Sequence, residues 1–135
     1  MASSVSACNP ASVALRCLIV DDNPGFSEAA RELLEGEGVA VVGVAASSAE
    51  AVQDVRELRP EVALVDIDLG PESGFELARR LADGVDGSAP QVILISTHDH
   101  REFLKLIESS PAVGFLAKTE LSAERISQLL DRADA

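Results

Sequence analysis

The sequence predicts an α/β domain with a five-stranded parallel sheet, doubly wound so that helices cover both faces. Five short apolar runs alternate with five segments of helical spacing, and this alternation requires parallel strands joined by right-handed crossovers. The runs are apolar on consecutive residues, as in strands covered on both faces. Of the 135 residues, 47% are hydrophobic and 3% aromatic, so we expect one domain with an aliphatic core.

The first two strand–helix units lie in the N-terminal half of the chain. The run Arg16–Val20 (RCLIV) precedes the helical segment Phe26–Glu35, and the run Val39–Ala45 precedes the helical segment Ala49–Leu58. Ser47 stands at the expected N-cap of the second helix, with the glutamate of a capping box three residues later. One face of the first helix is expected to hold Phe26, Ala29, Ala30, Leu33 and Leu34.

The last three units repeat this pattern. Each apolar run is followed by a segment whose apolar residues recur at helical spacing, and Ser122 is the expected N-cap of the final helix. In chain order the units are Val62–Val65 with Phe75–Ala82, Gln91–Ile95 with Arg101–Ser109, and Val113–Ala117 with Ala123–Arg132.

Composition excludes several classes of function. Acidic residues outnumber basic ones by 23 to 11, which gives a formal net charge of −12. Such a domain repels phosphate backbones and anionic lipid, so we expect no direct binding of nucleic acid or of a membrane. The two cysteines, Cys8 and Cys17, are too few for a disulfide framework, and a cytoplasmic location is expected. Residues 1–15 carry no charge and lack a signal-peptide pattern, so we interpret them as a disordered leader before a domain at 16–135.

Chemically active side chains follow the predicted strands where each strand ends. Asp21 and Asp22 follow the first strand, Asp66 the third, Ser96 the fourth and Lys118 the fifth. Carboxyl ends of parallel strands meet at one sheet edge, so these groups are expected to share a pocket. Three carboxylates at close range need a counter-charge, and Mg²⁺ prefers such oxygen ligands. A carboxylate can then act as the nucleophile toward a phosphoryl group.

This set of residues resembles the receiver domain of two-component response regulators, a flavodoxin-like fold. Asp66 lies 45 residues after Asp21, Ser96 lies 30 after Asp66, and Lys118 lies 22 after Ser96. Gly74, eight residues after Asp66, matches the family's glycine at the start of the third helix. The resemblance covers the chain from about residue 16 to residue 132 and implies a phosphorylation-dependent signalling switch rather than an enzyme.

The resemblance also implies a role for each residue. Asp66 is the expected phosphoacceptor, and Ser96 and Lys118 are expected to contact the phosphoryl group. Mg²⁺ is the implied cofactor, held by Asp21, Asp22, Asp66 and the backbone carbonyl of Asp68. Ser96 and Phe115 are the implied switch residues, and Asp68 and His98 are implied to tune the lifetime of the phosphoryl group.

The implied partners are proteins. A sensor histidine kinase or phosphotransfer protein would donate the phosphoryl group, and a downstream protein target or output domain would receive the signal. The responding surface would combine the fourth helix, the fifth strand and the fifth helix, and the same surface is one expected route to a homodimer. Two departures from the family pattern stand out: Thr119 replaces the usual proline after Lys118, and LGPESG follows Asp68.

Three alternatives stay open at this point. The chain could be the excised receiver of a DNA-binding transcription regulator rather than a single-domain regulator, since Ala135 follows the fifth helix closely. A haloacid-dehalogenase-type phosphatase also uses an aspartate nucleophile in an Asp-x-Asp motif, which Asp66 and Asp68 match, but expects it after the first strand. A flavodoxin-like carrier would need a Ser/Thr-rich phosphate loop after the first strand, which the sequence lacks.

Overall fold

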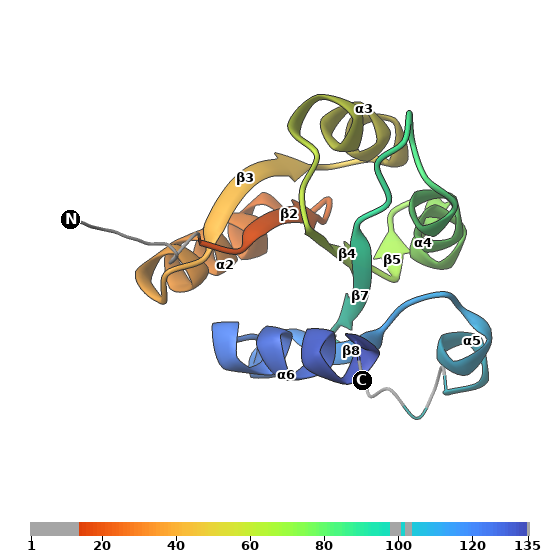
Figure 1. Cartoon of the computed structure of the whole chain (residues 1–135). Coiled ribbons are helices and arrows are strands. Elements are labelled where there is room, and N and C mark those ends of the chain that lie inside the picture. Colours follow the sequence, from red (N-terminus) through yellow and green to blue (C-terminus); the bar gives the residue numbers. More distant parts are fainter. Residues whose placement is uncertain (1–13, 98–100, 102–103, 135) are drawn as a thin grey trace.

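The computed structural model describes residues 14–97, 101 and 104–134, and it has the predicted α/β architecture (Figure 1). The main sheet has five parallel strands in the order β3-β2-β4-β7-β8. In a doubly wound sheet of this order the winding reverses between β2 and β4, the position where such folds bind ligands. The strands are β2 (Arg16–Val20), β3 (Ala40–Ala45), β4 (Val62–Asp66), β7 (Gln91–Ser96) and β8 (Gly114–Ala117).

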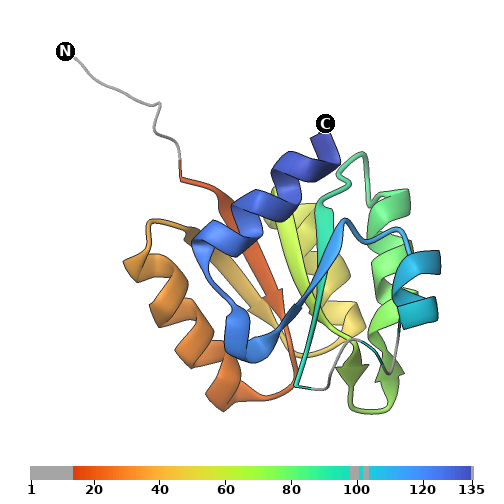
Figure 2. The same cartoon turned by 90° about the horizontal axis from the view of Figure 1, so that it is seen from below.

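In the part of the chain that the structure describes, five α-helices cover the two faces of the sheet (Figure 2). The core of one face is buried beneath α2 and α6, and that of the other beneath α3, α4 and α5. Alternate residues of β2 enter the two cores, which explains why its apolar residues are consecutive. The helices are α2 (Pro24–Gly36), α3 (Ser48–Leu58), α4 (Gly74–Asp83), α5 (Leu104–Ser109) and α6 (Ala123–Asp134).

Both predicted helix caps are present. The hydroxyl of Ser47 accepts a hydrogen bond from the Glu50 amide at 3.2 Å, and Glu50 Oε1 accepts one from the Ala46 amide. At the start of α6, the Ser122 hydroxyl accepts a hydrogen bond from the Arg125 amide at 3.1 Å. Short polar side chains therefore fix where these helices begin.

The apolar face predicted for the first helix is partly wrong. Ala30 and Leu34 are buried in α2, but Ala29 is exposed and Leu33 is 44% exposed. The helix also begins earlier than predicted, because Asn23 caps it and Pro24 suits its first position. Leu15 is the last residue of the proposed leader. It packs against the core, and its carbonyl accepts a hydrogen bond from the Ala40 amide.

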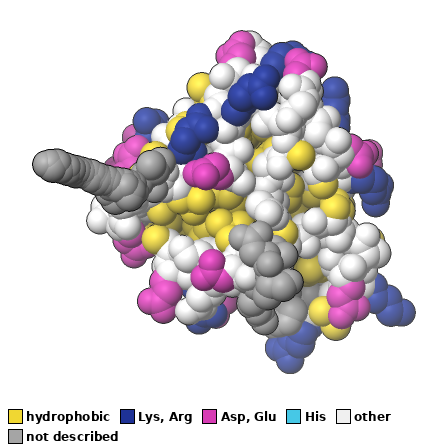
Figure 3. All heavy atoms as spheres, viewed as in Figure 1, with side chains coloured by type: hydrophobic (Ala, Val, Ile, Leu, Met, Phe, Trp, Pro, Cys, Tyr) yellow, Lys and Arg dark blue, Asp and Glu magenta, His cyan; other side chains and the backbone are white. Residues whose placement is uncertain are grey.

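Two short elements were not predicted. A two-stranded hairpin of β5 (Asp68–Leu69) and β6 (Glu72–Ser73) follows β4, and a single 3₁₀ turn, η2 (Lys118–Glu120), follows β8. The fourth predicted helix is described from Leu104 onward, and Phe103 lies outside the described residues. Within the described part of the chain, no helix combines the length and the apolar character that crossing a membrane requires. On the face drawn in Figure 3, acidic and basic side chains surround hydrophobic ones nearer the centre.

Candidate functional site

The predicted carboxylates meet at the carboxyl edge of the sheet. Asp21 directly follows β2, where its amide donates a hydrogen bond to the Ala45 carbonyl at 2.9 Å, and Asp66 is the last residue of β4. Asp21, Asp22 and Asp66 each offer a carboxylate oxygen, and these oxygens lie within 4.8 Å of one another. Asp21 and Asp66 are buried, whereas Asp22 is exposed, so the cluster has one side open to solvent.

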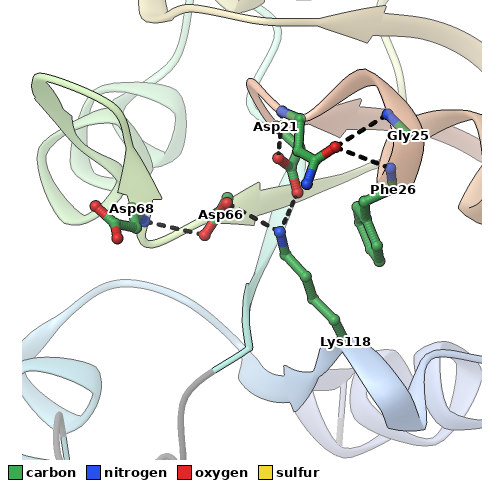
Figure 4. A network of polar contacts seen from close by, with 7 residues as sticks. Asp21, Gly25, Phe26, Asp66, Asp68 and Lys118 are labelled. Atoms are coloured by element: carbon green, nitrogen blue, oxygen red, sulfur yellow. Dashed lines mark hydrogen bonds and ion pairs between the residues drawn. The ribbon is translucent and has the colours of Figure 1, made fainter.

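Lys118 supplies the positive charge of this pocket (Figure 4). Its Nζ lies 2.5 Å from Asp21 Oδ2 and 3.1 Å from Asp66 Oδ2. Only 9% of the side chain is exposed, so the ion pairs are poorly screened by water. Because Lys118 follows β8, a strand two places from β4 in the sheet, the fold itself brings the ammonium to the central carboxylate.

The pKa values of the two partners reflect their shared burial. Burial raises the pKa of Asp66, and repulsion from Asp21 acts in the same direction, although hydrogen bonds from Asp68 and Lys118 oppose the rise. Burial alone would lower the pKa of Lys118, but its hydrogen bonds and ion pairs with Asp21 and Asp66 outweigh that effect and raise the pKa. Lys118 therefore stays charged near neutral pH and is a fixed counter-charge.

The segment after β4 shapes the mouth of the pocket. The Asp68 amide donates a hydrogen bond to Asp66 Oδ1 at 3.0 Å, while the Asp68 side chain is exposed. In the hairpin turn, Gly70 has a φ of +61°, and a Cβ there would stand 3.0 Å from Asp22 Oδ2. The turn at Gly70 therefore lies close to the exposed carboxylate of Asp22. A metal-ligand role for the Asp68 carbonyl stays a prediction.

The two expected switch residues lie on neighbouring strands. Ser96 is the buried last residue of β7 and pairs with Ala117 of β8, while Leu94 pairs with Phe115. Leu94 and Phe115 pack in the core beneath α3, α4 and α5, and Ser96, two residues beyond Leu94, points to the same face. Phe115 is half-buried.

Two further features considered from the sequence are His98 and the Lys118–Thr119 peptide bond. His98 lies outside the described residues, so its tuning role stays a prediction. Among the described peptide bonds none is cis, so the Lys118–Thr119 bond is trans.

Two residues near the pocket were not identified from the sequence. Asn23 Oδ1 accepts hydrogen bonds from the amides of Gly25 and Phe26, and the Asn23 amide donates to Asp21 Oδ1 at 2.8 Å. The ring of Phe26 lies beside Lys118, whose Nζ is 4.3 Å from the ring centroid. Asn-Pro after an acidic pair is typical of a helix cap, but no sequence signal distinguishes Phe26 from a core residue.

The fold and the site together define a doubly wound domain with an acidic, lysine-containing pocket at its ligand-binding edge. A sequence model of the response regulator receiver domain matches residues 17–131, and the chain belongs to that family. The predicted fold and the predicted function, a phosphorylation-dependent signalling switch, are confirmed at the level of this domain. The receiver domain is a signalling domain.

Similar proteins carry this domain in different settings. The signal receiver domain of a modulated diguanylate cyclase from Desulfovibrio desulfuricans G20 is 33% identical, with a TM-score of 0.73 over 90% of this chain and 94% of that one. The DNA-binding response regulator MtrA of Mycolicibacterium smegmatis is 35% identical over 70% of this chain and 40% of its own length. Protein-glutamate methylesterase/protein-glutamine glutaminase 5 of Myxococcus xanthus is 32% identical over 85% of this chain and 33% of its own length. Across seven curated relatives, the chain spans between 31% and 57% of their length.

Proposed function

We propose that residues 16–135 form a receiver domain that accepts a phosphoryl group on Asp66. The observation that carries this proposal is the position of the Lys118 ammonium, 3.1 Å from Asp66 Oδ2 within a cluster of three carboxylates. A carboxylate nucleophile beside a fixed positive charge, open to solvent on one side, is suited to phosphoryl transfer, which depends on positioning and charge neutralisation.

The transfer is a displacement at phosphorus. An oxygen of the Asp66 carboxylate forms a bond to phosphorus, the bond between phosphorus and the donor breaks, and its electron pair leaves with the donor group. Hydrolysis of the resulting acyl phosphate returns the carboxylate and inorganic phosphate. Lys118 and the Ser96 hydroxyl would contact the phosphoryl oxygens, because Ser96 ends β7, the strand next to β4, and Lys118 directly follows β8, the strand beyond it. The domain thus catalyses only its own phosphorylation and dephosphorylation.

The carboxylates fit a Mg²⁺ ion. Oxygens of Asp21, Asp22 and Asp66 lie within 4.8 Å of one another, and one side is open, as suits an ion that keeps several waters. The Asp68 carbonyl would complete the protein ligands. When bound, Mg²⁺ neutralises charge on the phosphoryl oxygens.

The proposed chemistry calls for protein partners. We propose a sensor histidine kinase or phosphotransfer protein as the donor and a downstream protein or an output domain as the target. A cytoplasmic location belongs to the same proposal. A second candidate, the receiver of a DNA-binding transcription regulator, is favoured by the similarity to MtrA, of whose length this chain spans 40%.

Mass spectrometry after incubation with Mg²⁺ and acetyl phosphate tests the assignment. The wild type should gain one phosphoryl group, and Asp66→Asn should gain none. Asp83→Asn, which makes the same change at an exposed residue of α4, should react as the wild type does. Phosphorylation of Asp66→Asn at the wild-type rate would refute the proposal.

A further inference from the structure

The ring of Phe26 contacts the ammonium of Lys118. The proposed function assigns a role to Lys118 but none to Phe26. Lys118 Nζ lies 4.3 Å from the ring centroid, within the range of a cation–π interaction. In the view of Figure 4, the ring and the carboxylate of Asp66 flank the ammonium on opposite sides. The ammonium is therefore enclosed by two carboxylates and an aromatic face.

The ring is fixed to the same helix end that meets the pocket. Phe26 lies in the first turn of α2, and its amide donates a hydrogen bond to Asn23 Oδ1 at 3.2 Å. The Asn23 amide in turn donates to Asp21 Oδ1, and Asp21 Oδ2 pairs with Lys118. These contacts connect the Phe26 ring, the Asn23 cap, the Asp21 carboxylate and the Lys118 ammonium in a closed loop. The position of the ring relative to Asp21 is therefore fixed by a few hydrogen bonds and ion pairs.

We propose that Phe26 is a positioning residue for Lys118, and that its ring holds the ammonium toward Asp66 for phosphoryl transfer; this inference rests on the proposed function. A lysine side chain has four flexible carbons, so its charge needs several contacts to stay in one place. In the proposed function Asp21 is also a metal ligand, and a bound cation competes with the ammonium for that carboxylate. The neutral ring does not take part in this competition.

A purely structural role for Phe26 makes a different prediction. Its half-buried side chain packs against the core beneath α2 and α6. That packing needs apolar surface but no aromatic face, so leucine or methionine would serve it nearly as well. Among the contacts described for Phe26, the one with Lys118 alone requires the ring.

The lysine content of the chain allows a direct test. Lys105 and Lys118 are the only two lysines, so ¹³C-lysine labelling gives one signal of interest and one internal control. The ring should shift the Lys118 CεH₂ protons upfield of those of exposed Lys105. Phe26→Leu and Phe26→Met should remove that shift without moving Lys105, and Phe26→Tyr should keep it. An unchanged Lys118 signal in both ring-free variants overturns the proposal.

The rate of phosphorylation provides a second test of the role proposed for Phe26. With acetyl phosphate and saturating Mg²⁺, Phe26→Leu should react about two- to fivefold more slowly, as loss of a partly exposed cation–π contact implies, and Phe26→Tyr should restore the rate. Leu130→Ala removes apolar packing from the same core in the second half of α6 and should react at the wild-type rate. Equal rates in Phe26→Leu and the wild type overturn the proposal. Wild-type modification of Asp66→Asn instead refutes the proposed function, whereas the Lys118 signal still reports the ring contact.

Discussion

Gly74 begins α4 with its backbone packed directly against the backbone of Asp66. A Cβ at Gly74 would collide with the Asp66 carbonyl oxygen and would stand 2.6 Å from Ile67 Cα. The Gly74 amide also donates a hydrogen bond to the Ile67 carbonyl at 3.1 Å. The atoms in the way belong to the backbone at the end of the central strand, so no side chain can rotate to make room. The glycine that follows the hairpin thus sets how closely α4 approaches the proposed phosphoacceptor.

Gly74→Ala should therefore weaken both the fold and the site. We expect a loss of roughly 1–3 kcal/mol in the free energy of unfolding, the usual cost of forcing an extra methyl group into a packed region. Urea denaturation measures this loss, and acetyl phosphate labelling of Asp66 should slow in parallel. Gly36→Ala is the matched control, because nothing lies within 4 Å of a Cβ there. Equal stabilities of the two variants would contradict the steric argument.

Asp22 provides a test of the metal site. It is the exposed member of the carboxylate cluster, so its removal should leave the core intact while removing one ligand. Saturating Mg²⁺ should raise the melting temperature of the wild type, since a ligand at 100 times its Kd adds about 2.7 kcal/mol to the stability. Asp22→Ala should reduce that gain. Glu32→Ala changes the net charge equally at an exposed site on α2 and should keep it. A wild-type melting temperature that stays the same when Mg²⁺ is added would argue against the metal site.

The sequence predicts the strands better than it predicts what surrounds the pocket. The bounds of β2 match the run Arg16–Val20, because its last four residues are buried and apolar in succession, as in a strand covered on both faces. The exposure of Leu33 could not be predicted, because helical spacing places it beside residues that α2 does bury. The β5–β6 hairpin depends on Gly70 adopting a positive φ, and the short polar segment around it has no periodicity to indicate strands.

The residues of the site also fall into two groups, those that the sequence predicts and those that it does not. Asp21, Asp66 and Lys118 were predictable because each ends or directly follows a strand, and the sheet order then brings them together. The contact between Phe26 and Lys118 joins the first turn of α2 to the 3₁₀ turn after β8, far along the chain, so only the folded structure places the two side by side.

Cys17 offers a probe of the core that is independent of phosphorylation. The thiol is fully buried in β2, and burial raises its pKa from 9.0 to about 12. In a Cys8→Ser background, labelling by iodoacetamide at pH 8 should therefore require unfolding. The folded state also keeps the Cys17 proton at a pH where the unfolded state loses it, so stability should fall as the pH rises above about 9. Cys17→Ala should flatten this part of the pH dependence in urea titrations, and rapid labelling in the native state would contradict the burial.

The output of the domain is expected to run from Asp66 to the surface formed by α5, β8 and α6. Phosphorylation adds about 1.5–2 negative charges and three acceptor oxygens at the edge of the sheet. Ser96 lies on the strand next to β4 and points to the same face as Phe115 on the strand beyond. If the Ser96 hydroxyl moves toward the phosphoryl oxygens, it vacates space on that face, and the Phe115 ring is the neighbouring side chain that can enter it. Phe115 has no hydroxyl group, so the change is one of packing.

This mechanism predicts which residues change their chemical shifts when a phosphoryl mimic binds. On binding beryllofluoride, chemical-shift changes should extend from Asp66 through Phe115 to Leu104–Ser109, because Ile107 of α5 packs in the same core as Phe115. A packing switch biased by a local charge exists in both states before modification, so the shifts should lie on a line between two end points. Ser96→Ala should leave phosphorylation largely intact and shorten the reach of these shifts, whereas Thr97→Ala, the same loss of a hydroxyl at the exposed next residue, should not. Changes confined to the neighbours of Asp66 in the wild type would mean that no such switch operates, and the domain would then serve as a phosphate sink.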